Sequence, residues 1–177
     1  MQETEVKILE IDRKKIEGNL ADLGAKKIFD GEIQTVFFDF KDGSIVKAKN
    51  VLRLRQEQGK IELTFKKVYS NQMAKQAEEL TVEVSNLESL KTILENIGLK
   101  ATESMQKHRV SYRLDGVRFD IDKYSGAYAC IPEFMEIEAG NTDLVTKYAL
   151  KLGFKPEECL PWSTNDLIQH YSKKRKT

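Results

Sequence analysis

The sequence has few of the residues that mark secreted, membrane-spanning or disulfide-rich proteins. Its 177 residues include two cysteines, three prolines and one tryptophan. Cys130 and Cys159 form neither a Cys-x-x-Cys pair nor a metal-ligand pattern, so we expect reduced thiols in a cytoplasmic protein. No apolar stretch is long enough to cross a membrane, and the early acidic residue Glu3 argues against a signal peptide.

The chain also lacks an excess of charge of either sign. It has 29 Lys and Arg residues against 28 Asp and Glu residues, which gives a net charge of +1. Such a protein has no broad field to attract nucleic acid or a membrane surface, so we expect neither as a partner. The basic run at residues 173–176 is typical of a solvated chain end. Aromatic residues do not interleave with the Arg and Lys pairs, which argues against single-stranded nucleic-acid binding.

No segment rich in Pro, Gly or Ser divides the chain. We therefore expect one domain over residues 1–177, which is enough chain to bury a core. A weak internal repeat is present, in which an acidic strand leads into a helix that ends in Leu or Ile, Gly, any residue and Lys. The three copies end at residues 23–26, 97–100 and 152–155. Each glycine suits the left-handed conformation that ends a helix.

The helices of this repeat have recognisable starts. Asp12, Asn86 and Thr142 precede amphipathic runs, and each can cap a helix N-terminus. The second helix carries an apolar stripe that we interpret as core packing, made of Leu87, Leu90, Ile93, Leu94 and Ile97. A further helix start is predicted at residues 163–166, where Ser-Thr-Asn-Asp can form a capping box. We expect this last helix to close one side or end of the fold.

Strand-like segments fill the rest of the chain, joined in two places by clear turn signals. The turns are Gln58-Gly59 and Asp115-Gly116, and the second is a strong two-residue hairpin signal. Eight strands joined largely by short connections favour a closed sheet. We expect the strands near residues 2–9, 26–40, 51–58, 60–68, 77–85, 101–114, 117–124 and 133–139.

Charged residues alternate with apolar residues along these strands, beginning at the amino terminus. Side chains two apart on a strand share a face, so Glu3, Glu5 and Lys7 lie together, with Thr4 and Val6 opposite. Carboxylates are hard oxygen ligands that suit Mg²⁺ or Mn²⁺, and a lysine can neutralise a phosphoryl oxygen. Alone, this pattern is also common on solvated strands.

The same alternation recurs farther along the chain, and most strands carry charges of a single sign. It aligns Arg53 with Arg55, Thr64 with Lys66, Lys107 with Arg109, Asp120 with Asp122, and Glu136 with Glu138. The simplest arrangement directs these faces toward one shared space that holds a polyanion and its metal ions. The apolar faces then pack outward against the helices, although a small barrel is normally filled with apolar side chains.

Together these motifs resemble the CYTH family, the triphosphate tunnel metalloenzymes, which include class IV adenylyl cyclases, thiamine triphosphatases and inorganic tripolyphosphatases. The resemblance implies an α+β fold, in which an eight-stranded antiparallel β-barrel encloses a charged tunnel and helices pack on its outside. It runs in order from residue 3 to about 140 and rests on Glu3-x-Glu5-x-Lys7, Leu52-Arg53-Leu54-Arg55, Leu63-Thr64-x-Lys66, Lys107-x-Arg109, Asp122 and Glu136-Ile137-Glu138.

The resemblance also implies a metal-dependent triphosphate site, because carboxylates would repel the substrate unless Mg²⁺ or Mn²⁺ intervened. We expect Lys7, Glu5 and Glu136 to take part in catalysis. The role of Glu79 stays open, because it can be either a site residue or a solvated carboxylate at the edge of the sheet. The expected phosphate-binding residues are Lys7, Arg53, Arg55, Lys66, Lys107 and Arg109. The expected metal ligands are Glu3, Glu5, Glu79, Asp122, Glu136 and Glu138.

Several other polar or aromatic residues are expected to lie outside this chemistry. His108 has the opposite parity to Lys107 and Arg109, so it should lie outside the tunnel. Packing or surface roles are expected for His170 and Trp162, and structural roles for Asp39 and Thr64.

The residues leave three functions open. In a triphosphatase, water attacks the terminal phosphorus. In a class IV adenylyl cyclase, the ribose 3′-hydroxyl attacks the α-phosphorus to make cyclic AMP. A sensor would bind a triphosphate or polyphosphate without turnover. We favour hydrolysis because it needs fewer substrate-specific features. The sequence leaves open the physiological substrate, the number of metal ions and whether a homodimer forms.

Overall fold

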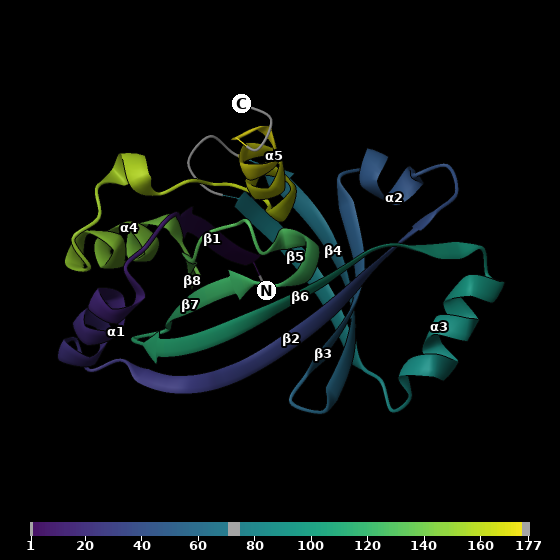
Figure 1. The fold of residues 1–177 in the computed structure, drawn as a ribbon, viewed down its shortest axis with the longest axis horizontal. Coiled ribbons are helices and arrows are strands. Elements are labelled where there is room, and N and C mark those ends of the chain that lie inside the picture. Colours follow the sequence, from purple (N-terminus) through teal and green to yellow (C-terminus); the bar gives the residue numbers. More distant parts are fainter. Residues whose placement is uncertain (1, 71–74, 175–177) are drawn as a thin grey trace.

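The computed structural model describes the backbone of residues 2–70 and 75–174, and the side chains of residues 4–67 and 78–172. In this part of the chain, eight antiparallel strands close into a barrel in the order β1-β5-β4-β3-β2-β6-β7-β8 (Figure 1). This confirms the predicted α+β barrel. The strands are β1 (Gln2–Ile8), β2 (Lys26–Phe40), β3 (Asn50–Glu57), β4 (Lys60–Ser70), β5 (Lys75–Glu83), β6 (Leu99–Leu114), β7 (Val117–Tyr124) and β8 (Phe134–Ala139).

Strand β1 closes the barrel because it pairs with both β5 and β8. The two predicted tight turns join β3 to β4 and β6 to β7. Gln58 and Gly59 have φ of 47° and 81°, and Asp115 and Gly116 have φ of 48° and 78°. Positive φ at both central residues is the conformation that matches the twist of paired strands in a two-residue hairpin. These turns align the charged faces of neighbouring strands.

The helices begin and end close to the predicted positions. The Asp12 side chain accepts a hydrogen bond from the Lys15 amide at the start of α1 (Arg13–Asp22), and Asn86 caps α3 (Leu87–Asn96) in the same way. The predicted cap of α4 (Thr142–Lys151) was wrong by one residue. Asn141 accepts from the Leu144 amide, because its backbone is extended whereas Thr142 is already helical.

Two of the predicted helix features concern short or terminal segments. Helix α5 (Thr164–Lys174) begins with the expected capping box, in which the Ser163 and Asp166 side chains accept from each other's backbone amides. The sequence pattern did not reveal α2 (Ser44–Lys47), which is too short for a periodic signal. None of the described helices is both long and apolar enough to span a membrane.

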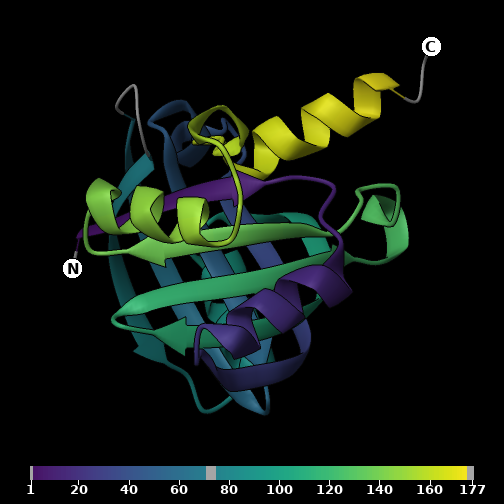
Figure 2. The same cartoon turned by 90° about the vertical axis from the view of Figure 1, so that its left-hand side faces the viewer.

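The apolar strand faces do point outward, as predicted. Val6, Phe119 and Ile137 pack against Leu20 of α1 and Tyr148 of α4, and all five side chains are buried. Figure 2 shows α1 and α4 lying across the strands of this side of the barrel. Because this core is outside the sheet, the inner face is free to carry charge.

Helix α3 covers another part of the outer surface, through Leu94 packed with Phe38, Leu54 and Leu99. The prediction that its whole apolar stripe packs in the core was wrong. Ile93 is 57% exposed and Ile97 is 62% exposed. Only the inner edge of the helix meets the sheet, so the stripe is wider than the contact.

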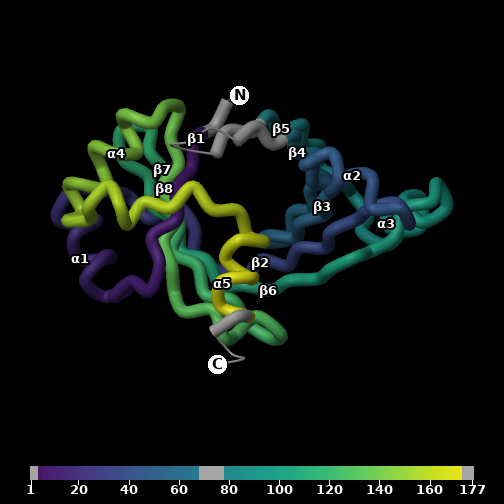
Figure 3. Tube along the Cα trace, turned by 90° about the horizontal axis from the view of Figure 1, so that it is seen from above, coloured from purple at the N-terminus to yellow at the C-terminus, as the bar shows by residue number. Residues whose placement is uncertain are grey.

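Helix α5 lies at one end of the barrel. Seen from above in Figure 3, α5 and the segment leading to it lie between the half that carries α1 and α4 and the half that carries α2 and α3. Leu167 and Tyr171 of α5 pack with Ile131 and Phe134. This placement fits the expectation that the last helix closes one end of the fold.

Candidate functional site

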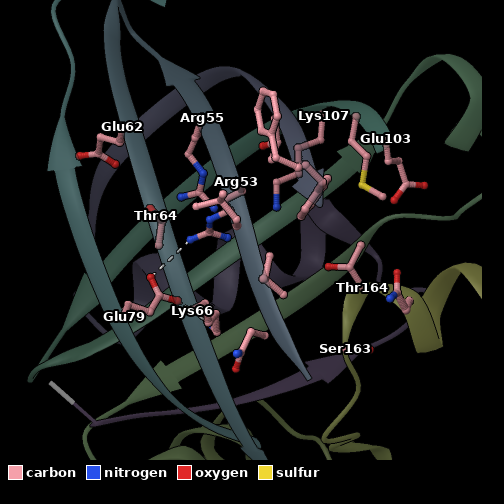
Figure 4. A pocket seen from close by; sticks show the side chains of 18 of the residues that line it. Arg53, Arg55, Glu62, Thr64, Lys66, Glu79, Glu103, Lys107, Ser163 and Thr164 are labelled. Atoms are coloured by element: carbon pink, nitrogen blue, oxygen red, sulfur yellow. Dashed lines mark hydrogen bonds and ion pairs between the residues drawn. The ribbon is translucent and has the colours of Figure 1, made fainter. Parts of the chain in front are cut away.

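A cavity of about 440 Å³ lies among the inward-facing side chains. Its size is in the range of small-molecule sites, roughly 300–1,000 Å³. Figure 4 shows labelled side chains projecting into it from several strands and from the start of α5. The charged side chains that line it are Glu5, Lys7, Arg53, Arg55, Glu62, Lys66, Glu79, Glu103, Lys107, Arg109, Arg118, Glu136 and Glu138.

Lys7 of β1 is almost completely buried, with 1% of its surface exposed. Its Nζ lies 2.7 Å from Oε1 of Glu136 and 3.7 Å from Oε1 of Glu5. Burial alone would lower the pKa of Lys7, but these two carboxylates outweigh burial and hold it above its ordinary value. These contacts therefore favour the ammonium form of Lys7.

Arg109 is surrounded by three carboxylates. It donates to Asp122 at 2.6 and 2.5 Å, to Asp120 at 2.5 Å and to Glu136 at 2.6 Å. Lys107 also donates to Asp122, at 2.6 Å. Asp122 is fully buried behind these two cations and is not part of the cavity wall. The structure thus places Asp122 as their counter-ion, and its role as a metal ligand stays a prediction.

Glu79 lines the cavity rather than lying on a solvated edge. Its carboxylate is 2.6 Å from Nζ of Lys66 and 3.4 Å from Arg53. Burial raises the pKa of Glu79, but Arg53 and Lys66 more than offset this and bring it below the ordinary value. Glu79 stays ionised and neutralises part of this basic wall.

Arg55 differs from the other cations because no carboxylate among the described residues forms an ion pair with it. Its Nε is buried without a hydrogen-bond partner. Burial, Arg53 and Arg109 together lower the pKa of Arg55 to about 10. Burial and Arg109 similarly lower the pKa of Lys107 to about 8, despite the contact with Asp122. Around Arg55 the described residues therefore leave positive charge without a matching carboxylate.

Glu5 and Glu138 are suited to hold a divalent cation. They sit directly opposite each other on β1 and β8. Like charges at such positions repel, and a cation between them would relieve the repulsion. Within the described side chains, no three His, Cys, Asp or Glu residues meet closely enough to hold a metal by themselves. The pair fits Mg²⁺, which typically takes one or two carboxylates and completes its shell with phosphate oxygens and water.

The other predicted residues fall into clear positions. The side chain of Glu3 lies outside the described residues, so its assignment as a metal ligand stays a prediction. His108 lies outside the cavity as expected, with Nε2 3.2 Å from Asp30. Asp39 has the expected structural role, because it accepts hydrogen bonds from three backbone amides around α2. Thr64 bonds to Thr81 and also lines the cavity.

Trp162 and His170 have packing roles, as expected, and they pack against each other, which was not predicted. Their ring centroids are 5.0 Å apart. Neither residue lines the cavity. Their packing lies beside the start of α5, where it helps to fix the position of that helix.

Several cavity residues were not predicted. Glu62, Glu103 and Arg118 have the same strand parity as predicted site residues two or four positions away, so that signal was available. The start of α5, which contributes Ser163 to Asn165, gave no such signal. Its proximity depends on the chain folding back over the barrel.

Other proteins resemble this chain over most of its length. A candidate adenylate cyclase from Methanocaldococcus jannaschii is 26% identical over 147 residues, which are 83% of this chain and 82% of that protein. The solved PH1012 protein of Pyrococcus horikoshii OT3 is 25% identical, with a TM-score of 0.77 over 93% of this chain and 98% of that one. An adenylyl cyclase candidate from Hippeastrum, described as having a dominant triphosphatase activity, is 14% identical, with a TM-score of 0.68 over 96% and 95%. The CYTH domain matches residues 1–170, and the chain therefore belongs to the CYTH domain family.

Proposed function

We propose that this protein is a divalent-metal-dependent enzyme that binds a triphosphate in the barrel cavity and cleaves a phosphoanhydride bond. The substrate class comprises inorganic tripolyphosphate, thiamine triphosphate and nucleoside triphosphates. The observation that carries the proposal is Arg55, a guanidinium with a buried, unpartnered Nε beside Arg53 and Arg109. A half-buried charge without a carboxylate partner among the described residues is costly, so the site is best explained by an anionic ligand that completes it.

The chain's own cations would bind and orient the phosphates. Arg53 and Arg55 offer planar forks that can bind phosphate through two hydrogen bonds each. Lys66, Lys107 and Arg109 line the same cavity and would add donors along the polyphosphate. Phosphoryl transfer depends mainly on such positioning and on charge neutralisation, so a covalent protein nucleophile is not required.

The carboxylates would hold the metal and the lysine that faces it. Glu5 and Glu138 would supply oxygen ligands, with Glu136 as a further candidate. When bound, Mg²⁺ or Mn²⁺ neutralises phosphate oxygens and increases the acidity of a bound water. Glu136 accepts from both Lys7 and Arg109, and these contacts hold the pKa of Glu136 below its ordinary value against the effect of burial. Glu136 is therefore expected to stay a carboxylate near neutral pH, and in this form it positions the ammonium group of Lys7.

Two alternatives share this binding apparatus. Cyclisation of ATP is supported by the Methanocaldococcus jannaschii relative, which is named as a candidate adenylate cyclase. Hydrolysis is supported by the activity described for the Hippeastrum protein, whose fold is similar. A protein that binds triphosphate without turnover would use the same cations. We favour hydrolysis, because it needs fewer substrate-specific features than cyclisation does.

A product assay separates these reactions. The purified protein is incubated with tripolyphosphate, thiamine triphosphate or ATP, each with Mg²⁺, Mn²⁺ or a chelator. We expect phosphate release that requires the metal. Cyclic AMP and pyrophosphate from ATP would replace hydrolysis with cyclisation. Tight binding without product would leave only the binding function, and no binding of any triphosphate would refute the proposal.

A further inference from the structure

The cavity changes character along the barrel. On the inner face of β6, the order is Glu103, Met105, Lys107 and Arg109, so an acid and an apolar residue precede the cations. Four residues on a strand span about 14 Å, which places Glu103 well away from Lys107. Figure 4 shows Glu103 and Glu62 on opposite sides of the cavity, with arginines between them.

Apolar side chains surround this acidic end. Phe37 is the direct neighbour of Glu103 on β2, and the next inward residue of β6 is Met105. Val51 begins the inner face of β3, and Ile45 and Val46 of α2 also line the cavity. The cavity volume of about 440 Å³ is within the range of sites for whole organic ligands. This section can therefore receive an organic group beyond the phosphates.

Glu103 is held in place at this end. The Tyr128 hydroxyl donates to its Oε1, and that bond is the main reason that the pKa of Tyr128 rises to about 12. No other described residue donates to Glu103 or forms an ion pair with it, so Oε2 is available as an acceptor. A carboxylate here repels phosphate, but it accepts a hydrogen bond from an N–H group and attracts a cation.

We propose that Glu103, positioned by Tyr128, binds a donor nitrogen on the organic group of the substrate and so determines substrate preference. The preferred substrate is then a triphosphate ester whose heteroaromatic ring carries an amino group or a positive charge, rather than inorganic tripolyphosphate. Phe37 and Met105 provide the apolar contacts for the ring. This inference rests on the proposed function, because it assumes that the phosphates occupy the cationic section.

The test compares substrates that differ at the donor. ATP carries an amino group on its base where purine riboside triphosphate carries only hydrogen, and thiamine triphosphate has both an amino group and a ring cation. In the wild-type protein we expect a higher kcat/KM for ATP or thiamine triphosphate than for purine riboside triphosphate. In Glu103→Gln the preference for ATP over purine riboside triphosphate should fall about tenfold, mainly through KM, because a neutral amide oxygen accepts a hydrogen bond more weakly than a carboxylate. Activity on tripolyphosphate should not change.

Two further variants identify the cause. Tyr128→Phe removes the anchor of Glu103 and should reduce the same preference by a smaller factor. Glu88→Gln changes an exposed carboxylate on α3 and should leave all ratios unchanged. Thermal unfolding of each variant checks that it is folded.

The outcomes separate the two proposals. If Glu103→Gln leaves the preferences for ATP and for thiamine triphosphate over purine riboside triphosphate intact, or lowers tripolyphosphate activity equally, the role of Glu103 is refuted while the triphosphatase proposal stands. If the wild-type protein neither binds nor cleaves any of the four compounds, the proposed function fails and this inference fails with it.

Discussion

At the scale of single residues, positive charge inside the barrel is neutralised unevenly. Lys7 contacts two carboxylates and Arg109 contacts three, whereas Arg55 has no ion-pair partner among the described residues. Paired charges hold the inner wall together, and an unpaired one destabilises the protein until a ligand binds. Arg55 should therefore contribute to binding at the expense of stability.

Substitution of Arg55 tests this balance. Arg55→Met should weaken tripolyphosphate binding by roughly 1.5–3 kcal/mol, the range for a hydrogen bond to a charged group. The same change should raise the free energy of unfolding without ligand by about 1 kcal/mol, because it removes a half-buried charge that has no ion-pair partner among the described residues. Titration calorimetry and urea denaturation measure the two quantities. Arg113→Met is the control, since Arg113 is exposed and outside the cavity lining. Unchanged affinity in Arg55→Met would show that its guanidinium does not meet the anion.

Substitution of Glu5 tests the metal assignment. Glu5→Gln removes one of the two facing carboxylates and should raise the Mg²⁺ concentration for half-maximal activity about tenfold or more. Direct binding of Mn²⁺, followed by its paramagnetic resonance signal, should weaken in parallel. Glu88→Gln, on the surface of α3, should match the wild-type protein in both measurements. A wild-type metal response in Glu5→Gln would remove Glu5 from the metal site.

At the scale of elements, the end of β2 and the short helix α2 are joined through Asp39. Its carboxylate accepts from the amides of Phe40 at 2.7 Å, Ile45 at 2.9 Å and Val46 at 3.1 Å. Ile45 and Val46 line the apolar section of the cavity. Asp39 therefore shapes the apolar section of the cavity without lining it.

This arrangement predicts a pH dependence of stability. Burial raises the pKa of Asp39, but the three amide hydrogen bonds outweigh burial, so the pKa in the folded protein lies below its ordinary value. The carboxylate thus stabilises the fold above about pH 4, and this contribution is lost as the pH falls through the folded pKa. Asp39→Asn should lower the free energy of unfolding by about 1–2 kcal/mol at pH 7. The difference between the variant and the wild-type protein should shrink in acid. Denaturation of both proteins across this range measures it.

The neighbouring Asp42→Asn is a matched control for that experiment. Asp42 is exposed and accepts a single hydrogen bond, from the Ser44 amide. Asp42→Asn should therefore lower the free energy of unfolding by less than Asp39→Asn does. A difference between wild type and Asp39→Asn that is constant at all pH values would contradict the assigned role of the carboxylate.

At the scale of the whole molecule, the barrel wall faces two different environments. Its outer face carries the apolar core under α1, α3 and α4, and its inner face carries the charged cavity. Most of the stability therefore comes from outside the sheet. The inner face can retain mutually repelling cations because the outer layers keep the strands in place.

A bound polyanion should consequently stabilise the entire fold. Tripolyphosphate with Mg²⁺ at about 100 times its Kd should raise the free energy of unfolding by about 2.7 kcal/mol. Thermal unfolding with and without the ligand measures this increase. Sodium sulfate at equal ionic strength should give a much smaller increase in stability, because a short anion cannot reach all the cations that line the cavity. Equal stabilisation by both salts would indicate general screening rather than a specific site.

The strand assignments and the inward direction of the charges followed from the two-residue alternation in the chain, whereas the eight-stranded barrel was expected from the number of strands, the short connections and the resemblance to the CYTH family. That signal is local, because parity on one strand decides which side chains share a face. The same parity placed His108 outside and Lys107 inside. It was less informative at helix ends, where Asn141 and Thr142 are equally plausible caps on sequence alone.

The pairing of charges was decided only by the tertiary structure. Arg109 and Glu136 are 27 positions apart and meet at 2.6 Å, and the register of β6, β7 and β8 brings them together. The sequence predicted cations and carboxylates on the inner face, but it did not predict that Asp122 would be the counter-ion of Lys107 and Arg109, or that Arg55 would have no ion-pair partner among the described residues. Nor did it place Glu103 and the start of α5 at the same cavity. Strand parity gives the face of a side chain, whereas its neighbours depend on register and barrel closure, and these are set by packing across the whole molecule.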